Sequence, residues 1–129
     1  MEVLYENEYI QIRLNDPNKC IEYQWKKHAP TEELKNLMDK VYKYVSVHGC
    51  NKLLPDLRNL EKLPDEVRLW AESEWFPLLV KKGVRIYAVV SANSALSRDP
   101  TIKTSKNEFG VITRYFDDVL KARTWISML

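Results

Sequence analysis

The sequence predicts an α/β fold in which strands and helices alternate along a single domain of residues 1–129. Three observations support this prediction. Residues 9–25 have the period-two alternation of a β-hairpin, and two amphipathic helical stretches are each followed by a β-rich run. Residues 114–126 then end the pattern as a short strand, an acidic cap and a helix. A chain of 129 residues is long enough for one sizeable hydrophobic core.

The N-terminal hairpin is recognised from its alternation and its turn. Apolar Ile10, Ile12 and Leu14 alternate with more polar neighbours, as they do in a half-buried strand. The turn-forming residues 15–18 follow, and a second alternating run comes after them. We therefore expect two antiparallel strands joined by a tight turn, with residues 3–5 as an extension or a short extra strand.

The middle of the chain predicts two helices and two strands. The first helix begins after Pro30, and its apolar stripe consists of Leu34, Leu37, Met38, Val41 and Val45. Residues 53–57 indicate a strand, in which Pro55 requires a bulge, an early end or a partner on one side only. The second helix should kink or split at Pro77. Residues 84–90 have the nearly continuous apolar pattern of a strand that is covered on both faces.

The last third of the chain is less regular. Residues 91–110 are rich in serine and threonine, so we expect a short helix and a mobile loop there. A final strand and the closing helix follow, with Asp117 as the expected helix cap. The predicted docking face of this helix consists of Ala122, Trp125, Ile126 and Leu129.

Composition and charge exclude several classes of partner. The chain has 20 Lys and Arg and 18 Asp and Glu residues, interleaved, for a net charge of +2. A nucleic-acid-binding protein usually gathers its cations on one face, so we expect no nucleic acid as a partner. No run reaches the roughly 18 apolar residues of a membrane span, and the first residues lack the pattern of a secretory signal. We therefore expect a cytoplasmic location.

Cysteines and histidines indicate neither a metal site nor a cofactor. Cys20, Cys50, His28 and His48 do not have the spacing of metal ligands. A Cys50 nucleophile with His48 as its base is the sharper alternative. However, Cys50 follows a helix C-terminus, where the negative end of the dipole disfavours a thiolate. A structural thiol is therefore the favoured interpretation, and we expect no catalytic residue here.

Four segments occur in an order that is typical of one known family. They are Leu53-Leu54-Pro55-Asp56-Leu57-Arg58, Trp75-Phe76-Pro77 followed by Gly83, residues 84–90, and Tyr115-Phe116-Asp117-Asp118 followed by Ala122 and Trp125. On these segments the chain resembles the SpoIIAA-like proteins, bacterial single-domain proteins of the STAS/SEC14 type. The resemblance implies a mixed sheet of four to five strands with an N-terminal β-hairpin and helices mainly on one face.

The functional implications of the resemblance are limited. Classical anti-sigma-factor antagonists of this class carry a phosphorylatable serine at the start of the second helix, in an Asp-Ser-Ser-Gly setting. In this chain Asp56 is followed by residues 57–60 with neither serine nor glycine, so the phosphoserine switch is not carried over. The SEC14 side of the class binds lipid-like ligands in an apolar pocket, within a much larger domain.

Polar residues follow two of the predicted strands. Asp56 and Arg58 lie just past one strand, and Ser91, Asn93 and Ser94 lie just past the next. Open α/β sheets bind ligands at the carboxyl ends of their strands, so these five residues form a candidate site for a small polar or anionic ligand. The alternative is structural: Asp56 caps a turn and pairs with a solvated Arg58, which is the more common role for such a pair.

A second candidate site is apolar. Trp75, Phe76 and Tyr87 could line a pocket opened by the kink at Pro77, although core packing is the simpler role for aromatic residues. We therefore expect a non-enzymatic regulatory module that binds a protein or a small molecule. The alternatives are a carrier of a small apolar, lipid-like ligand, and an enzyme of unknown class that uses Asp56, Arg58 and Ser94. A homodimer through an uncovered face or edge of the sheet also remains open.

Overall fold

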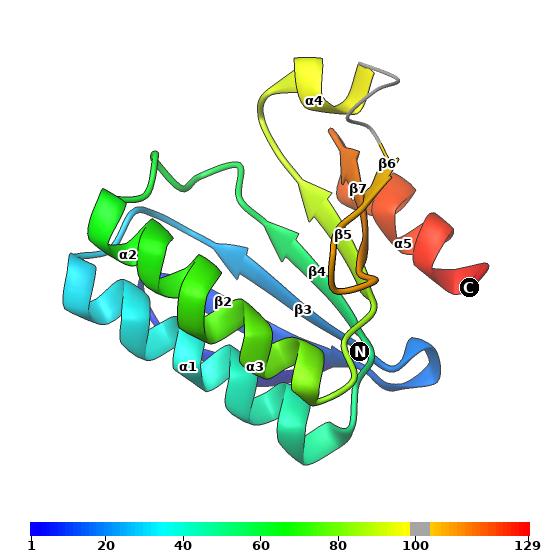
Figure 1. Ribbon diagram of the computed structural model, residues 1–129, viewed down its shortest axis with the longest axis horizontal. Helices are drawn as coiled ribbons and strands as arrows, with labels where there is room; N and C mark the ends of the chain where they lie inside the picture. Colours follow the sequence, from blue (N-terminus) through cyan, green and yellow to red (C-terminus); the bar gives the residue numbers. More distant parts are fainter. Residues whose placement is uncertain (99–103) are drawn as a thin grey trace.

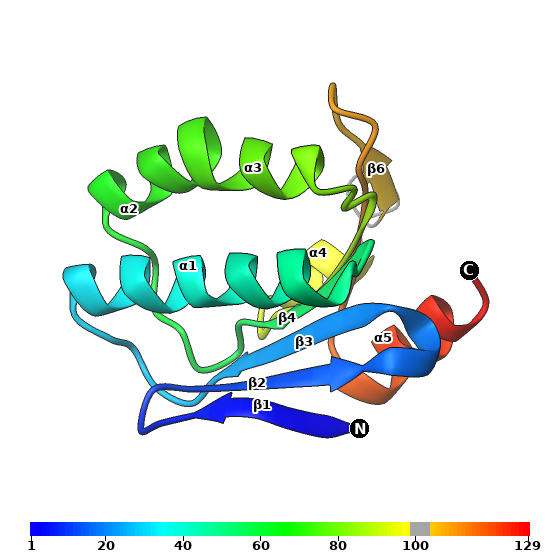
Figure 2. The ribbon, with the colours of Figure 1, turned by 90° about the horizontal axis from the view of Figure 1, so that it is seen from below.

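The structure, a computed structural model, describes residues 1–98 and 104–129. One mixed β-sheet lies at its centre (Figure 1). Helices α1 (Thr31–His48), α2 (Asp65–Trp70) and α3 (Phe76–Lys81) cover one face, and α5 (Val119–Ser127) covers the other (Figure 2). The α/β prediction is therefore confirmed, with α5 set apart from the other long helices. None of the helices in the described ranges combines the length and the hydropathy of a membrane-crossing segment.

The sheet of the described residues has seven strands in the order β1-β2-β3-β4-β5-β7-β6. The strands are β1 (Glu2–Glu6), β2 (Ile10–Asn15), β3 (Cys20–Trp25), β4 (Lys52–Asp56), β5 (Ile86–Val90), β6 (Thr104–Lys106) and β7 (Ile112–Phe116). Strands β3, β4, β5 and β7 are mutually parallel, and β1, β2 and β6 add antiparallel edges. The expected count of four to five strands is wrong, because β1 pairs as a separate strand and β6 forms a hairpin with β7.

The N-terminal hairpin is confirmed. Strands β2 and β3 pair in antiparallel register from Ile10 opposite Trp25 to Asn15 opposite Cys20. The turn is a short 3-10 helix, Asp16–Asn18, and Lys19 then takes a left-handed conformation with φ of 52°. The chain therefore reverses where the turn-forming residues 15–18 predict a turn.

Helix α1 matches its predicted stripe. The buried residues of this helix are Leu34, Leu37, Met38, Val41 and Val45. They pack with Ile21, Tyr23 and Leu53 from the sheet in the larger core. Gly49 ends the helix with a φ of 62°, a conformation that glycine adopts without steric cost.

Helices α2 and α3 form one continuous rod with an irregular centre. Between them, Ala71–Trp75 form a π-helical turn, in which the backbone N–H of Phe76 donates to the carbonyl oxygen of Ala71. Pro77 lies in the first turn of α3, where its missing N–H is tolerated. The helix is therefore not split at Pro77, and its irregularity is instead the π turn, which ends two residues before the proline.

The central strands separate two cores. Alternating side chains of β3, β4 and β5 point to opposite faces of the sheet. The smaller core consists of Cys20, Leu54, Ala88, Val90, Phe116, Ala122 and Ile126. Pro55 is accommodated in β4, whose register with β5 includes Lys52, Leu53 and Asp56 but not the proline. This pairing fits the expected one-sided partner for a residue without an N–H.

The closing helix is capped by Asp118 rather than Asp117. The Asp118 carboxylate accepts a hydrogen bond of 2.7 Å from the backbone N–H of Leu120. Asp118 has the extended backbone, φ −142° and ψ 131°, that an N-cap requires, whereas Asp117 pairs with Lys121 one turn into the helix. On the predicted docking face Ala122 and Ile126 are buried, but Leu129 lies beyond the helix and is exposed.

Residues 91–110 contain more structure than a loop. The short helix α4 (Ser94–Arg98) is present as expected, and strand β6 lies in the segment for which a loop was expected. For residues 99–103 the expectation of a mobile loop lies outside the described residues. A turn at Asn107–Gly110 joins β6 to β7, closed by a hydrogen bond from the backbone N–H of Gly110 to the carbonyl oxygen of Asn107.

Candidate functional site

Two adjoining pockets form an apolar groove on the helix-rich face, beside the rod of α2 and α3. They share Met38, Leu63 and Tyr87, and we call the combined depression the Tyr87 groove. The first pocket has a volume of about 480 Å³, and its further lining includes Ala71, Trp75, Phe76 and Phe109. The second has a volume of about 300 Å³ and is further lined by residues that include Tyr23, Trp25, Leu57, Leu60 and Ser91. All three residues of the predicted apolar pocket therefore line one depression.

The helical wall of the groove is held in place by Trp75. Its indole Nε1–H donates a hydrogen bond of 2.7 Å to the backbone carbonyl oxygen of Met38 on α1. Trp75 is buried and ends the π-helical turn. Since a π turn adds one residue to a helical turn, it shifts the residues after it around the helix axis. This local irregularity therefore sets the positions of both Trp75 and its neighbour Phe76.

Aromatic rings connect the helix, the sheet and the last hairpin. Phe76 lies 5.7 Å from Tyr87 and 6.4 Å from Phe109, measured between ring centroids. Phe109 lies in the β6–β7 turn, which Asn107 stabilises because its side-chain oxygen accepts from the backbone N–H groups of Phe109 and Val111, both at 3.0 Å. Phe109 remains 42% exposed, so this wall of the groove faces solvent.

A pair of tyrosine hydroxyls supplies polarity inside the groove. The oxygens of Tyr23 and Tyr87 lie 3.4 Å apart. Burial raises the pKa of both phenols, and for Tyr23 the neighbouring Tyr87 raises it further. Both hydroxyls therefore stay protonated near neutral pH and can donate or accept a hydrogen bond. Charged side chains of both signs also line the groove: Arg68, Glu72 and Glu108 in the first pocket, and Glu61 and Lys62 in the second.

The polar candidates Asp56 and Arg58 form a closed ion pair. The Nε and Nη2 groups of Arg58 donate to the two carboxylate oxygens of Asp56 at 2.9 and 2.7 Å. The backbone N–H of Arg58 also donates to Asp56 Oδ1 at 3.2 Å. The hydrogen bond with Asp56 raises the pKa of Arg58 above its ordinary value. This geometry fits the structural alternative, since both carboxylate oxygens are occupied.

The other polar candidates stabilise the chain after β5. Ser91 Oγ accepts a hydrogen bond of 3.1 Å from the backbone N–H of Asn93. The side-chain oxygen of Asn93 in turn accepts from the N–H of Ala95 at 3.1 Å, inside α4. Ser94 begins α4, and its side chain lies outside what the structure describes. Ser91 lines the Tyr87 groove, whereas Asp56 and Arg58 do not, so the five candidates do not converge on one cavity.

The two cysteines are buried free thiols. Burial raises the pKa of both Cys20 and Cys50, which lowers their nucleophilicity at neutral pH. The ring of His48 stacks on Tyr44 at 6.4 Å. Over residues 1–98 and 104–129, no group of three or more His, Cys, Asp and Glu side chains is placed to hold a metal ion.

Sequence reasoning missed two groups of residues in and around the groove. The helical periodicity predicts Met38 on the core stripe of α1, and it does pack there, but it also lines both pockets. Leu63 and Phe109 lie in connecting segments without a periodic pattern. For Phe109, the sequence offers one signal, which is that an aromatic residue follows the turn-forming Asn107.

Comparison with known proteins adds no assignment. The chain matches no protein-family model, and no curated protein is significantly similar to it.

Proposed function

We propose that this protein is a non-enzymatic, cytoplasmic regulatory module whose activity depends on binding a small apolar molecule in the Tyr87 groove. The observation that carries the proposal is the continuity of the two pockets through Met38, Leu63 and Tyr87. Each pocket has a volume in the range of about 300–1,000 Å³ that is usual for small-molecule sites. The combination of an apolar lining with few polar groups is also typical of such sites.

The chemistry of the lining supports an apolar ligand with at most one polar group. Aromatic rings from α3, β5 and the β6–β7 turn form the walls. The Tyr23 and Tyr87 hydroxyls offer one neutral hydrogen-bonding point, with Tyr87 lining both pockets and Tyr23 the second. The charged lining residues are of both signs, Arg68 and Lys62 with Glu61, Glu72 and Glu108, so the groove offers no large excess of charge that would select a charged ligand. The groove thus favours an uncharged or weakly polar ligand.

The polar candidates support a binding role rather than a catalytic one. Asp56 is buried and held by Arg58 through both of its carboxylate oxygens, a geometry that fixes it as a structural partner and does not direct it into either pocket of the groove. The order of a hairpin, α1, β4, the α2–α3 rod, β5, β7 and α5 also supports a STAS-like fold as part of this proposal.

The test uses N-phenyl-1-naphthylamine, an uncharged dye that fluoresces in apolar sites, together with mass spectrometry of an organic extract of the native protein. We expect saturable dye binding that Phe109→Ser weakens roughly fivefold, since part of a phenyl ring is withdrawn from the site. Leu69→Ser removes an exposed apolar side chain from the same helical rod without touching either pocket, and should leave the affinity unchanged.

A second variant fills the first pocket. Ala71 lines it from the π-helical turn, so Ala71→Trp should abolish dye binding by occupying the space. Equal dye affinity in the wild type and in all three variants would overturn the proposal. An extract without apolar compounds, combined with no dye binding to the native protein, would overturn it as well.

A further inference from the structure

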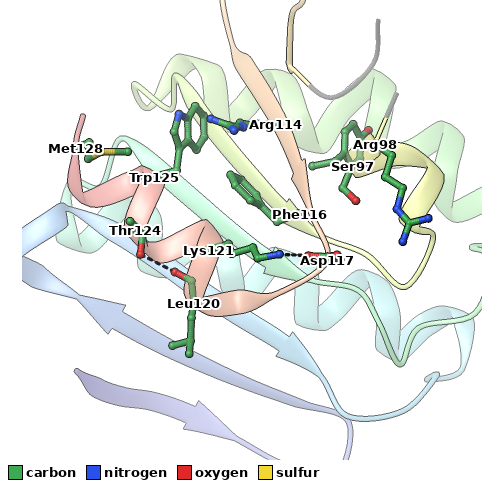
Figure 3. A pocket seen from close by; sticks show the side chains of 11 residues that line it. Ser97, Arg98, Arg114, Phe116, Asp117, Leu120, Lys121, Thr124, Trp125 and Met128 are labelled. Atoms are coloured by element: carbon green, nitrogen blue, oxygen red, sulfur yellow. Dashed lines mark hydrogen bonds and ion pairs between the residues drawn. The ribbon is translucent and has the colours of Figure 1, made fainter. Parts of the chain in front are cut away.

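A separate cleft lies on the opposite face of the sheet, between β7, α4 and α5 (Figure 3). Its volume is about 560 Å³. Its apolar lining includes Phe116, Trp125, Leu120 and Met128, and its charged lining consists of Arg98, Arg114, Asp117 and Lys121. The cleft therefore combines aromatic and aliphatic surface with an excess of positive charge.

Arg114 is the residue that distinguishes this cleft from an apolar groove. Its guanidinium carbon lies 5.1 Å from the ring centroid of Phe116 and 5.6 Å from that of Trp125. The two rings are themselves 5.7 Å apart with a tilt of 44°. Figure 3 shows Arg114 beside Trp125 at the end of the cleft near Met128. Contact with two aromatic rings restricts the orientation of the guanidinium group.

Part of this guanidinium group is left without a hydrogen bond. The Nε atom of Arg114 is buried and has no partner in the part of the chain that the structure describes. The guanidinium group of Arg114 thus has no acceptor among the described residues, and an anion that approached from the cleft would meet its terminal Nη groups rather than the buried Nε. The planar pair of Nη groups is suited to a carboxylate or a phosphate group, which can accept two parallel hydrogen bonds.

The remaining charges of the cleft do not neutralise Arg114. Asp117 is the one acid among the described lining residues, and its carboxylate pairs with Lys121 at 3.3 Å. Arg98, from the end of α4, adds a further cation to the lining. The charge of the cleft is therefore complementary to a ligand that carries a negative group.

We propose that this cleft binds a small organic anion whose carboxylate or phosphate head pairs with Arg114 and whose apolar body packs on Trp125, Leu120 and Met128. Leu120 in the first turn of α5 and Met128 directly after the helix are 63% and 71% exposed, so they offer apolar surface to such a body. The cleft shares no lining residue with the Tyr87 groove, and the sheet lies between the two.

The test measures binding to the full chain by isothermal titration calorimetry. The probes are 3-phenylpropionate, phenyl phosphate, inorganic phosphate and the uncharged 3-phenylpropanamide. We expect at least one of the two phenyl-bearing anions to bind saturably, with the amide and inorganic phosphate at least tenfold weaker. Preference between the two anions identifies the head group as a carboxylate or a phosphate.

Variants connect this binding to the cleft. Arg114→Gln removes the charge while keeping a similar shape, and it should weaken binding about 10- to 100-fold. Leu120→Asp places a carboxylate at an exposed position of the lining, so it should repel the anion without disturbing the core. Lys82→Gln, an exposed cation outside the cleft, removes the same charge as Arg114→Gln and should have no effect.

Three outcomes would overturn the proposal. The first is the absence of saturable binding by either phenyl-bearing anion. The second is equal binding of the anion and its amide, since the head group would then contribute nothing. The third is unchanged affinity in both Arg114→Gln and Leu120→Asp. None of these outcomes bears on the Tyr87 groove, whose probe is uncharged.

Discussion

The buried ion pair between Glu22 and Arg123 leads to the strongest prediction about the stability of this fold. The Glu22 side chain is completely buried in β3, on the face covered by α5. Arg123 of α5 donates to it three times: Nε to Oε1 and Oε2, each at 3.1 Å, and Nη2 to Oε1 at 3.0 Å. Arg13 of β2, which lies opposite Glu22 in the sheet register, adds one contact at 3.3 Å.

The magnitude follows from these contacts. Removing one partner of a buried ion pair usually costs about 3–5 kcal/mol, because the other charge stays buried without compensation. Arg123→Met removes three of the four contacts to Glu22, but the contact from Arg13 remains. The Arg123 side chain is also 28% exposed, so the ion pair is partly accessible to solvent. We therefore expect a loss near the lower end, about 3 kcal/mol. Small domains have a free energy of unfolding of about 5–15 kcal/mol, so a loss of this size should be easy to measure.

The assay is urea unfolding followed by tryptophan fluorescence. Lys121→Met is the matched control on the same helix, because Lys121 makes an exposed i,i+4 pair with Asp117 and should cost no more than about 0.5 kcal/mol. A double-mutant cycle adds Glu22→Leu and the double variant. When Glu22 is already replaced by Leu, Arg123→Met should cause almost no further loss in the free energy of unfolding. An equal cost of Arg123→Met with and without Glu22 would refute the reasoning.

Two further predictions concern the end of the chain and the thiols. Asp118→Ala should lower the free energy of unfolding by about 1 kcal/mol through loss of the cap to Leu120, and Asp117→Ala by clearly less; a reversed order in urea unfolding would contradict the assigned cap. Burial raises the pKa of Cys20 and Cys50, so neither thiol should react with Ellman's reagent in the native protein, and both should react after unfolding in guanidinium chloride; one equivalent released from the native state would contradict this.

Much of the fold could be predicted because its elements have local patterns. The stripe of α1 and the β2–β3 hairpin appear in the sequence at periods of 3.6 and 2, and the structure has both. Strand β6 could not be predicted in this way. Its residues Thr104–Lys106 are all exposed and lack apolar alternation, so the strand exists through its pairing with β7.

Long-range contacts account for what the sequence does not reveal about the sites. Glu22 alternates with apolar residues like an ordinary solvent-facing position, and the partner that allows its burial lies 101 residues further along the chain. The aromatic spacing around Pro77 indicated Trp75, Phe76 and Tyr87, which do line one groove. Arg114 contacts the rings of Phe116 on β7 and Trp125 on α5. These two elements come together only in the folded chain, so no local sequence pattern predicts the contact.

The β6–β7 hairpin has a consequence for how the two cavities relate. Phe109 at its tip forms a wall of the Tyr87 groove, and Arg114 on its second strand lines the cleft on the other side of the sheet. The second strand of the hairpin is also fixed to β5 by five paired residues, from Ile86 opposite Ile112 to Val90 opposite Phe116. A substitution that changes the position of β7 relative to β5 would therefore change a wall of each cavity at once, so variants in this hairpin need both cavities to be assayed.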